Sequence, residues 1–453
     1  MNSIIATKRL PPEQTVVEGE GIISKLHESI LGKILSFLPT TDAVHTSVLS
    51  KGWIHVWKSI TGLQFNDALH PLGKKMQKEH FVCFVKKVIL HLANSSIQSF
   101  SLCLTCYHYD STLVSAWISS ILQRGVQNLH IQYADEILFP SCSLFSCNSL
   151  VQLVLQMKCT VSVPIFSSLP NLENLSISGI RLVSESSNYS EDLILNFPVL
   201  KVLEARGCEW LTKQNIGIKA PLLERFSIAI WNSLSNKSHK SAIKIFAPNL
   251  ADFSYGGDLE QEIILLNSAS IHSASVVIVA DEDKMTNVGK LGFQVHKLLA
   301  QIREVKQLKL LFYKVLMHAR DIFTHLPAFS RLSYLQLNEV TGEALLNILN
   351  NCPILSSLVL QNGVSESNKD HVLTSASVPQ CFLSSLKVFQ FKEFNVREHE
   401  LLLAKFVLAN AAVLEQMIIC TAFWLRYSEI DVEKVKDQIL SFPKCSNLVM
   451  IQF

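Results

Sequence analysis

Apolar and polar positions alternate with a helical period in the first part of the chain. Ile30, Ile34 and Leu38 recur every four residues, with Leu31 and Leu35 beside them. This spacing predicts an amphipathic helix that begins near Ser24 and ends before Pro39. Thr40, Thr41 or Asp42 can cap a second helix, and Ser50 can cap a third one that carries Trp53 and Trp57. Three short helices cannot enclose a large core, so we expect another structure to cover part of this apolar stripe.

A different pattern, apolar-x-x-apolar-x-apolar, repeats from Ile97 to Phe453 at an average spacing of about 27 residues. Strong instances are Leu172-Leu175-Ile177 and Leu332-Leu335-Leu337, and a weak one is Ala274-Val277-Val279. Each unit predicts one short strand that can bury its apolar side only against neighbouring units. Several units carry a proline two residues before the first apolar position, as in "FPVLKVL" and "APLLERF", which ends the preceding segment.

These repeats predict an α/β fold: three N-terminal helices, then an irregular leucine-rich-repeat solenoid with a parallel sheet on its concave face. An antiparallel sandwich is the alternative reading of so many short strands. It needs tight hairpin turns of the Asn-Gly or Asp-Gly kind, and none joins these segments. The long links between strands favour parallel pairing.

Composition and charge exclude several classes of protein. Apolar residues form 48% of the chain and charged residues 17%, with a formal net charge of +2. This composition argues against disorder and against a general nucleic-acid-binding field. No apolar run is long enough for a membrane span and no signal peptide is recognisable, so we expect no membrane contact. The scattered, odd-numbered cysteines indicate reduced thiols and predict a cytoplasmic or nuclear location, or both.

Candidate catalytic and metal sites are weak. The chain contains no G-x-S-x-G elbow, no P-loop and no G-x-G-x-x-G motif, and we expect neither enzymatic activity nor a cofactor. Cys103 and Cys106, followed by Cys142 and Cys147, suggest a zinc site at first sight. Their predicted positions on a strand face and in a link between units argue against it, so we expect no metal.

The segment "ISKLHESILGKILSFLPTTDAVHTSVLSKGWIHVWKSITGLQFND" resembles an F-box of the form found in large plant families. The resemblance implies docking to a Skp-type adaptor, which joins the chain to the cullin and RING subunits of a ubiquitin ligase. The residues that would make this contact are Leu26, Ile30, Ile34, Leu35, Leu38, Pro39, Val44, Val48 and Leu49. The same resemblance gives Trp53 and Trp57 a structural role within the module.

This F-box departs from the family pattern at two kinds of position. His27 stands where the family usually has proline, and Gly52 and Ile54 stand where it usually has basic residues. Two alternatives therefore stay open. The module is a degenerate F-box on a leucine-rich interaction scaffold that engages no ligase, or it is a plain helical cap on the repeat array.

Two further segments extend the resemblance to plant F-box/FBD/leucine-rich-repeat proteins. "LVSAWISSILQRGVQNLHI" is similar to the segment that follows the F-box, and "CFLSSLKVFQFKEFNVREHELLLAKFVLANAAVLEQMII" is similar to the closing FBD region. The expected organisation is a flexible leader (1–21), the F-box (22–66), a helical linker (67–96), the repeats (97–380) and an FBD region that continues the solenoid (381–453).

One face of the predicted sheet is open to a partner, because alternate side chains of each strand point away from the core. The candidate target-binding residues on it are His130, Gln132, Glu204, Arg206, Tyr334, Gln336 and Asn338. Tyr334 and Arg206 are the expected anchors, since aromatic and arginine residues dominate contact energies. A merely solvated face is the alternative. The sequence thus predicts a non-catalytic substrate receptor that binds an adaptor at one end and an unknown target protein along the repeats.

Overall fold

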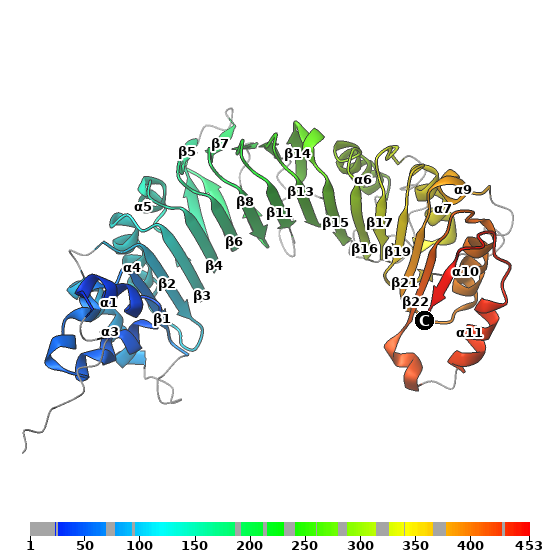
Figure 1. Ribbon diagram of the computed structural model, residues 1–453. Helices are drawn as coiled ribbons and strands as arrows, with labels where there is room; N and C mark the ends of the chain where they lie inside the picture. Colours follow the sequence, from blue (N-terminus) through cyan, green and yellow to red (C-terminus); the bar gives the residue numbers. More distant parts are fainter. Residues whose placement is uncertain are drawn as a thin grey trace, which may run out of the picture. The chain divides into compact units, whose positions relative to one another are not determined.

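The computed structural model describes residues 23, 26–68, 78–92, 96–185, 192–211, 215–230, 241–259, 261–279, 288–313, 326–338, 340–365, 377–427 and 431–453. The chain divides into two compact units, Met1–Tyr107 and His108–Phe453. The two units are shown in Figure 1, and each has its own core.

The first unit combines short helices with two strands. Its elements are α1 (Glu28–Leu35), α2 (Thr40–His45), the 3₁₀ helices η2 (Thr46–Val48), η3 (Lys51–Trp53) and η4 (Val56–Ser59), β1 (Gly62–Asn66), α3 (Lys78–His91) and β2 (Ser99–Leu104). Strand β1 pairs with β2 in parallel, and Leu63 and Phe65 on β1 are buried. Sequence reasoning placed the first strand at Ile97 and therefore missed β1.

The prediction of a third α-helix is wrong. The segment after Ser50 forms two separate 3₁₀ helices, η3 and η4, rather than one α-helix through Trp53 and Trp57. Gly52 lies inside η3, where glycine disfavours a continuous helix. Trp57 is buried and its ring lies 6.1 Å from that of His91 on α3. Trp57 therefore packs the module against the next helix, α3.

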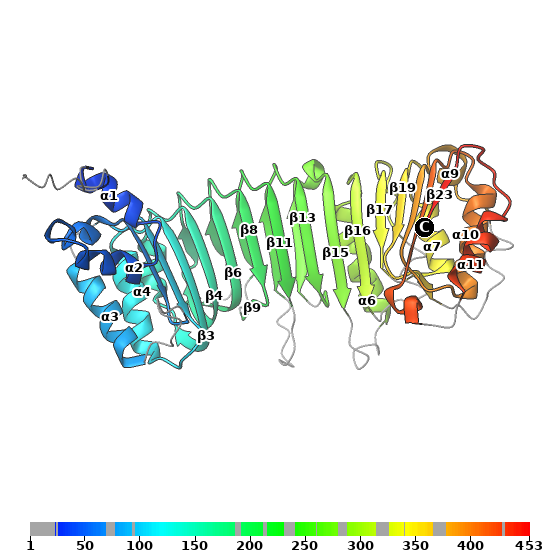
Figure 2. The same ribbon diagram turned by 60° about the horizontal axis from the view of Figure 1, so that its bottom comes forward.

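The second unit is built on one long parallel sheet (Figures 1 and 2). Its strands follow the chain order β3, β4, β6, β8, β11, β13, β15, β16, β17, β19, β21, β22, β23. Their bounds are Asn128–Leu138, Gln152–Val163, Asn174–Ser184, Val202–Arg206, Arg225–Ile230, Asp252–Gly257, Ser273–Val279, Gln307–Tyr313, Tyr334–Leu337, Ser357–Leu360, Val388–Phe394, Gln416–Thr421 and Met450–Gln452. The parallel order confirms a mixed α/β fold and excludes the antiparallel sandwich.

The middle apolar residue of most repeats stands in one buried row across the sheet. The row consists of Leu153, Leu175, Leu203, Phe226, Phe253, Ala274, Leu308, Leu335, Leu358, Phe389 and Met417. At one unit the predicted register is wrong by three residues. Ala274 and Val276 point inward, whereas the sequence pattern assigned Val277 and Val279 to the core.

The recurring prolines have a structural explanation. In Phe197-Pro198-Val199-Leu200 the amide of Leu200 donates to the carbonyl of Phe197 over 3.4 Å, and the proline occupies the second position of this turn. The same turn recurs before Leu172, Leu223, Leu250 and Leu355. Proline fits this position because its fixed φ matches the turn and the turn needs no amide there.

Successive units are joined by a backbone ladder at the strand starts. The carbonyl of Lys201, for example, accepts from the amides of Glu224 (2.9 Å) and Arg225 (3.1 Å) in the next unit. Glu224 then repeats this role toward Ala251 and Asp252. Each unit is therefore bonded to its neighbours in the same way.

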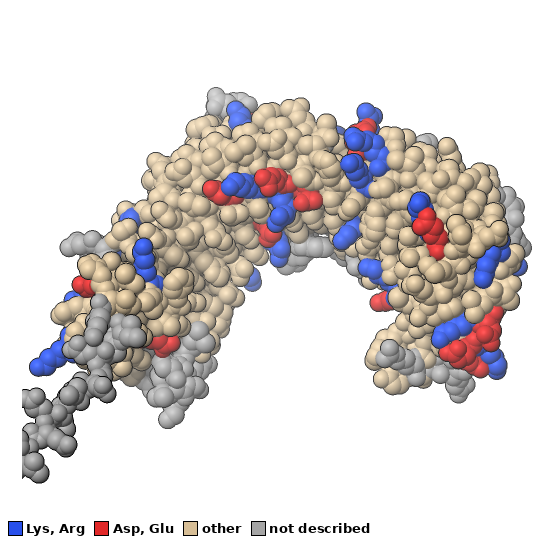
Figure 3. All heavy atoms as spheres, viewed as in Figure 1, with Lys and Arg blue, Asp and Glu red and all other residues tan. Residues whose placement is uncertain are grey.

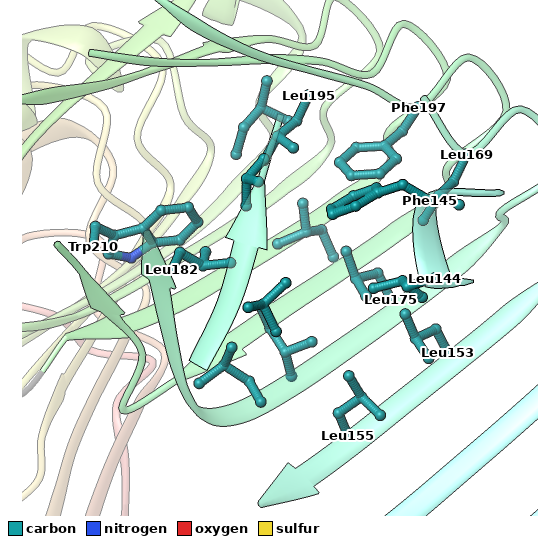
Figure 4. A pocket seen from close by; sticks show the side chains of 16 residues that line it. Leu144, Phe145, Leu153, Leu155, Leu169, Leu175, Leu182, Leu195, Phe197 and Trp210 are labelled. Atoms are coloured by element: carbon teal, nitrogen blue, oxygen red, sulfur yellow. The ribbon is translucent and has the colours of Figure 1, made fainter. Parts of the chain in front are cut away.

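A second parallel sheet, which sequence reasoning missed, lies in the links between the main strands. Its order is β14-β12-β10-β7-β5, with bounds Glu262–Leu266, Ala242–Phe246, Ile216–Lys219, Leu193–Asn196 and Phe166–Ser168. Between this sheet and β4, β6 and β8 lies a cavity of about 60 Å³ with wholly apolar walls, including Leu195, Phe197 and Trp210 (Figure 4). The two sheets therefore pack imperfectly at this point.

Helices complete the second unit. They are α4 (Ser111–Gln123), α5 (Ser141–Ser146), α6 (Val288–Gln301), α7 (Gly342–Asn350), α9 (Gln380–Ser384), α10 (Glu398–Asn410) and α11 (Val432–Leu440), with the 3₁₀ helices η5 (Ser268–Ser270) and η8 (Phe423–Tyr427). Short strands β9 (Glu209–Trp210), β18 (Val340–Thr341) and β20 (Val364–Ser365) add local pairs. Helices α6, α7, α9 and α10 lie on one side of the main sheet, and within the described part of the chain they leave its other face open (Figure 1). None of the helices in the described ranges is both long and apolar enough to cross a bilayer.

Candidate functional site

Helix α1 divides its apolar residues between two sides. Leu31 and Leu35 face inward and are 6% and 3% exposed, while Ile30 and Ile34 face outward and are 47% and 46% exposed. Because side chains three or four positions apart share a helix side, this helix has two apolar faces. Only one of them is needed for the core of the first unit.

Exposed apolar side chains also occur in the turn after α1 and around η2. Phe37 is 88% exposed, Val48 83%, Leu49 67% and Leu38 39%. We call Ile30, Ile34, Phe37, Leu38, Val48 and Leu49 the apolar cluster. Large exposed apolar residues within so short a segment are typical of an interaction surface.

Two close contacts hold the segments that present the apolar cluster. A Cβ on Gly32 would lie 2.7 Å from the carbonyl oxygen of Ser59, so α1 can approach η4 closely only with glycine at this position. The buried hydroxyl of Thr40 accepts from the amide of Gln64 on β1 over 2.7 Å. These contacts fix α1 and α2 against the rest of the first unit.

His27, where the F-box pattern usually has proline, is the N-cap of α1. Its Nδ1 accepts from the amide of Ser29 over 3.3 Å and lies 2.8 Å from the Ser29 hydroxyl. Ser24, the predicted cap, lies outside the described residues. Pro39 precedes the first turn of α2 without a side-chain cap, so the predicted caps at Thr40, Thr41 and Asp42 are wrong. The departure at His27 is compatible with helix α1.

The predicted adaptor-binding residues fall into three groups. Ile30, Ile34, Leu38, Val48 and Leu49 are exposed, and Leu26, Pro39 and Val44 are half-buried. Leu35 is buried, because it lies on the inward face of α1 with Leu31, and it offers no side chain to a partner. Phe37, which lies two residues beyond the end of α1, was missed.

The open face of the main sheet carries most of the predicted target-binding residues. His130 and Arg206 are exposed, and Gln132, Glu204 and Tyr334 are half-buried. Arg206 pairs with Glu204 over 3.1 Å on the same strand, which reduces its freedom to act as an anchor. Partial desolvation by the surrounding sheet lowers the pKa of His130, which favours its neutral form, and raises the pKa of the Tyr334 phenol.

Gln336 and Asn338 do not belong to the accessible surface. They are 8% and 3% exposed, respectively. The Gln336 amide donates to the Gln361 carbonyl oxygen over 2.9 Å, and its own oxygen accepts from the Tyr334 hydroxyl over 3.2 Å. The side chain is therefore engaged within the protein, which the alternation of the strand could not reveal.

Charge on the second unit is balanced locally. Lys201 pairs with Glu173 over 2.9 Å, and Lys387 pairs with Glu415 over 2.8 Å. Figure 3 shows the same arrangement, with small groups in which both signs touch and wide uncharged areas between them. A surface of this kind favours recognition through hydrogen bonds and shape over a general electrostatic field.

The surroundings of Cys103 and Cys147, two of the cysteines considered for zinc, do not favour metal binding. Burial and the neighbouring Asp67 carboxylate raise the pKa of the Cys103 thiol, which disfavours the thiolate that binds metals. Cys147 is buried, and its thiol lies 3.8 Å from the carbonyl oxygen of Val126. Within the described ranges, no group of three or more His, Cys, Asp or Glu side chains could hold a metal ion.

Family comparisons agree with the two ends of this architecture. A model of the F-box domain matches residues 23–62, which contain the whole apolar cluster, and a model of the FBD region matches residues 374–419. The fold and the exposed helical surface therefore belong to an F-box protein with a C-terminal FBD region.

Full-length relatives come from Arabidopsis thaliana. An F-box/FBD/LRR-repeat protein of this plant is 31% identical over 444 residues, which cover 96% of this chain and 94% of the relative. An FBD-associated F-box protein is 28% identical over 429 residues, 88% of each chain, and F-box/LRR-repeat protein 13 is 26% identical over 445 residues, 94% of each. The chain belongs to the plant F-box/FBD/LRR-repeat family.

Proposed function

We propose that this protein is the substrate-recognition subunit of a Skp–cullin–F-box ubiquitin ligase. The apolar cluster carries the proposal, because it lies within the F-box match and is exposed in the free chain. A Skp-type adaptor would cover the cluster and connect the chain to the cullin and RING subunits. Fully covering one such side chain stabilises a complex by about 1.5–3 kcal/mol, so a few of them suffice for specific binding.

The repeated units are proposed to form a leucine-rich-repeat solenoid that binds the target protein. The shared inward row, the recurring proline turn and the LRR-repeat relatives support this assignment. His130, Gln132, Glu204, Arg206 and Tyr334 are the proposed contacts on the open face. Tyr334 stays the preferred anchor, because its ring is half-buried and its hydroxyl is already oriented by Gln336.

The proposed role requires no catalysis by this chain. The ubiquitin-conjugating enzyme would perform the chemistry, and the receptor would raise the local concentration of the target beside it. The proposed location is the cytoplasm, the nucleus or both. The proposed F-box and FBD boundaries, 22–66 and 381–453, remain those expected from the sequence.

Binding to a purified plant Skp-type adaptor tests the proposal. Wild type should bind, and Leu38→Asp should not, because the new carboxylate would be buried in an apolar interface. Leu90→Asp is the matched control, since Leu90 is an exposed leucine of α3 in the same unit but outside the F-box match. The control should bind like wild type.

The opposite result identifies the alternative. If folded wild-type protein fails to bind any Skp-type adaptor, the F-box is degenerate and the chain is an interaction scaffold. If binding survives Leu38→Asp, the adaptor uses a surface other than the apolar cluster. Where Leu38→Asp abolishes adaptor binding as expected, affinity purification with the proteasome inhibited separates target proteins, shared by wild type and variant, from ligase subunits, lost in the variant.

A further inference from the structure

Two exposed lysines flank the apolar cluster. Lys33 lies on α1 between Ile30 and Ile34, and Lys51 follows Val48 by three residues at the start of η3. Neither makes a salt bridge with any residue in the described part of the chain. Two uncompensated positive charges therefore stand beside the largest exposed apolar side chains of the first unit.

Negative charge does not offset them at the cluster. Glu28 is exposed but lies in the first turn of α1, more than one helical turn before Lys33. Asp42 is half-buried in the first turn of α2, where a carboxylate is stabilised by the positive end of the helix. A third exposed lysine, Lys58, lies on η4, which packs against α1. The charge that a partner meets around the cluster is therefore positive.

We infer that the partner seated on the apolar cluster carries carboxylates around its apolar groove, opposite Lys33 and Lys51. This inference rests on the proposed adaptor-binding function and adds the kind of partner surface that fits. Charge complementarity favours such a partner, because a neutral or basic rim around the partner's groove would leave the ammonium groups of both lysines uncompensated at the edge of the interface. Because both lysines are exposed, they steer the encounter and select the partner, while the apolar cluster supplies the binding energy.

The effect of Lys33 and Lys51 on binding should appear mainly in the association rate. Charges exposed at the rim of an interface act over about one Debye length, which is about 10 Å at 0.1 M salt. Removing a rim charge changes the association rate and its salt dependence, whereas truncating a buried group changes the dissociation rate. Lys33 and Lys51 are thus distinguishable from Phe37 and Leu38 by kinetics alone.

The test is the association rate of the full chain with a purified plant Skp-type adaptor, measured at several salt concentrations. The charge reversal Lys33→Glu/Lys51→Glu should slow association about tenfold at about 0.05 M salt, and the difference should largely vanish at about 0.5 M. Lys33→Gln/Lys51→Gln should show a smaller effect of the same sign. Lys86→Glu is the matched control, an exposed lysine on α3 outside the F-box match, and should associate like wild type.

A gain of charge tests the same idea in the other direction. Gly52 is exposed, and a Cβ there would meet only the Ser50 hydroxyl, at 3.7 Å. Gly52→Arg therefore has room and should speed association at low salt. Thermal unfolding of each variant separates a kinetic effect from loss of the fold.

The outcomes distinguish this inference from the proposed function. Adaptor binding with equal association rates for wild type and the charge-reversed variant would overturn the acidic rim and leave the receptor role intact. Absence of binding at every salt concentration would overturn the receptor role itself. Binding of the full chain to vesicles rich in phosphatidylserine, lost in Lys33→Glu/Lys51→Glu without adaptor binding, would assign the same surface to a membrane and refute the inference.

Discussion

Replacing Phe37 with alanine should weaken adaptor binding without affecting the stability of the protein. Full burial of a phenylalanine side chain stabilises by about 1.5–3 kcal/mol relative to exposure. Because Phe37 is 88% exposed in the free chain, nearly all of that gain is available to a partner. We expect a loss of about 2 kcal/mol, which raises Kd about 30-fold. The free energy of unfolding should change by less than about 0.5 kcal/mol, since surface substitutions rarely cost more.

Two control variants complete the design, with titration calorimetry for Kd and urea unfolding for stability. Leu31→Ala removes a buried side chain of the same helix and should cost about 2–5 kcal/mol of folding free energy. Leu90→Ala removes an exposed leucine of α3 and should alter neither quantity. The reasoning is refuted if Phe37→Ala binds the adaptor as tightly as wild type, or if it destabilises the free chain as much as Leu31→Ala does.

Three further substitutions test the packing and the electrostatics of the fold. Gly32→Ala would place a Cβ 2.7 Å from a carbonyl oxygen of η4 and should lower stability by about 1–3 kcal/mol. Gly52→Ala, whose Cβ would make only an ordinary contact of 3.7 Å with the Ser50 hydroxyl, should not, and urea unfolding compares the two. Val161→Ile adds a methyl group beside the cavity of about 60 Å³. An empty cavity of this size costs about 1.4 kcal/mol, so the melting temperature should rise and the free energy of unfolding should increase by less than about 1 kcal/mol. A lower melting temperature would mean that the added group cannot reach the cavity. The hydrogen bond from Lys244 lowers the pKa of the Asp192 carboxyl, so its stabilising effect is present at neutral pH and is lost as the pH falls through the ordinary aspartate range to the lower folded-state value. Asp192→Asn should therefore be less stable than wild type at neutral pH and equally stable in acid, and a difference that is the same at every pH would contradict this assignment.

The parallel sheet could be predicted because its signal repeats. A single apolar-x-x-apolar-x-apolar segment is ambiguous, but the recurrence of Leu175, Leu203 and Leu335 in equivalent places predicts one common environment. The register failed where the chemistry of the repeat weakens. Ala274 stands in a row that larger apolar residues, mostly leucine and phenylalanine, occupy elsewhere. Because Val277 nearby is larger and also apolar, the sequence pattern was assigned to it and not to Ala274.

The second sheet could not be predicted with the same rule. Its strands contain only three to five residues with alternating apolar positions, as in Leu193–Asn196 and Ile216–Lys219. Such short segments are equally compatible with turns or irregular structure. They pair only because the main sheet places the segments that connect its strands next to one another. This information lies in the tertiary structure and has no local sequence signal.

The first unit illustrates the same division between periodicity and packing. The spacing of four residues predicted helix α1 and its outward residues, including Ile30 and Ile34. Periodicity did not determine which leucine faces inward, because Leu31 and Leu35 lie beside the same stripe and their burial depends on the approach of η4 at Gly32. Phe37 was missed because it lies beyond the helix end, where the helical period no longer applies.

The proline turn and the backbone ladder also bear on how such chains change in evolution. Each segment between two turns begins and ends with the same geometry, and its main-chain bonds reach only the adjacent segments. A duplication or deletion that spans one whole segment would leave compatible ends to rejoin, so chain length can vary in discrete steps while both termini keep their own roles.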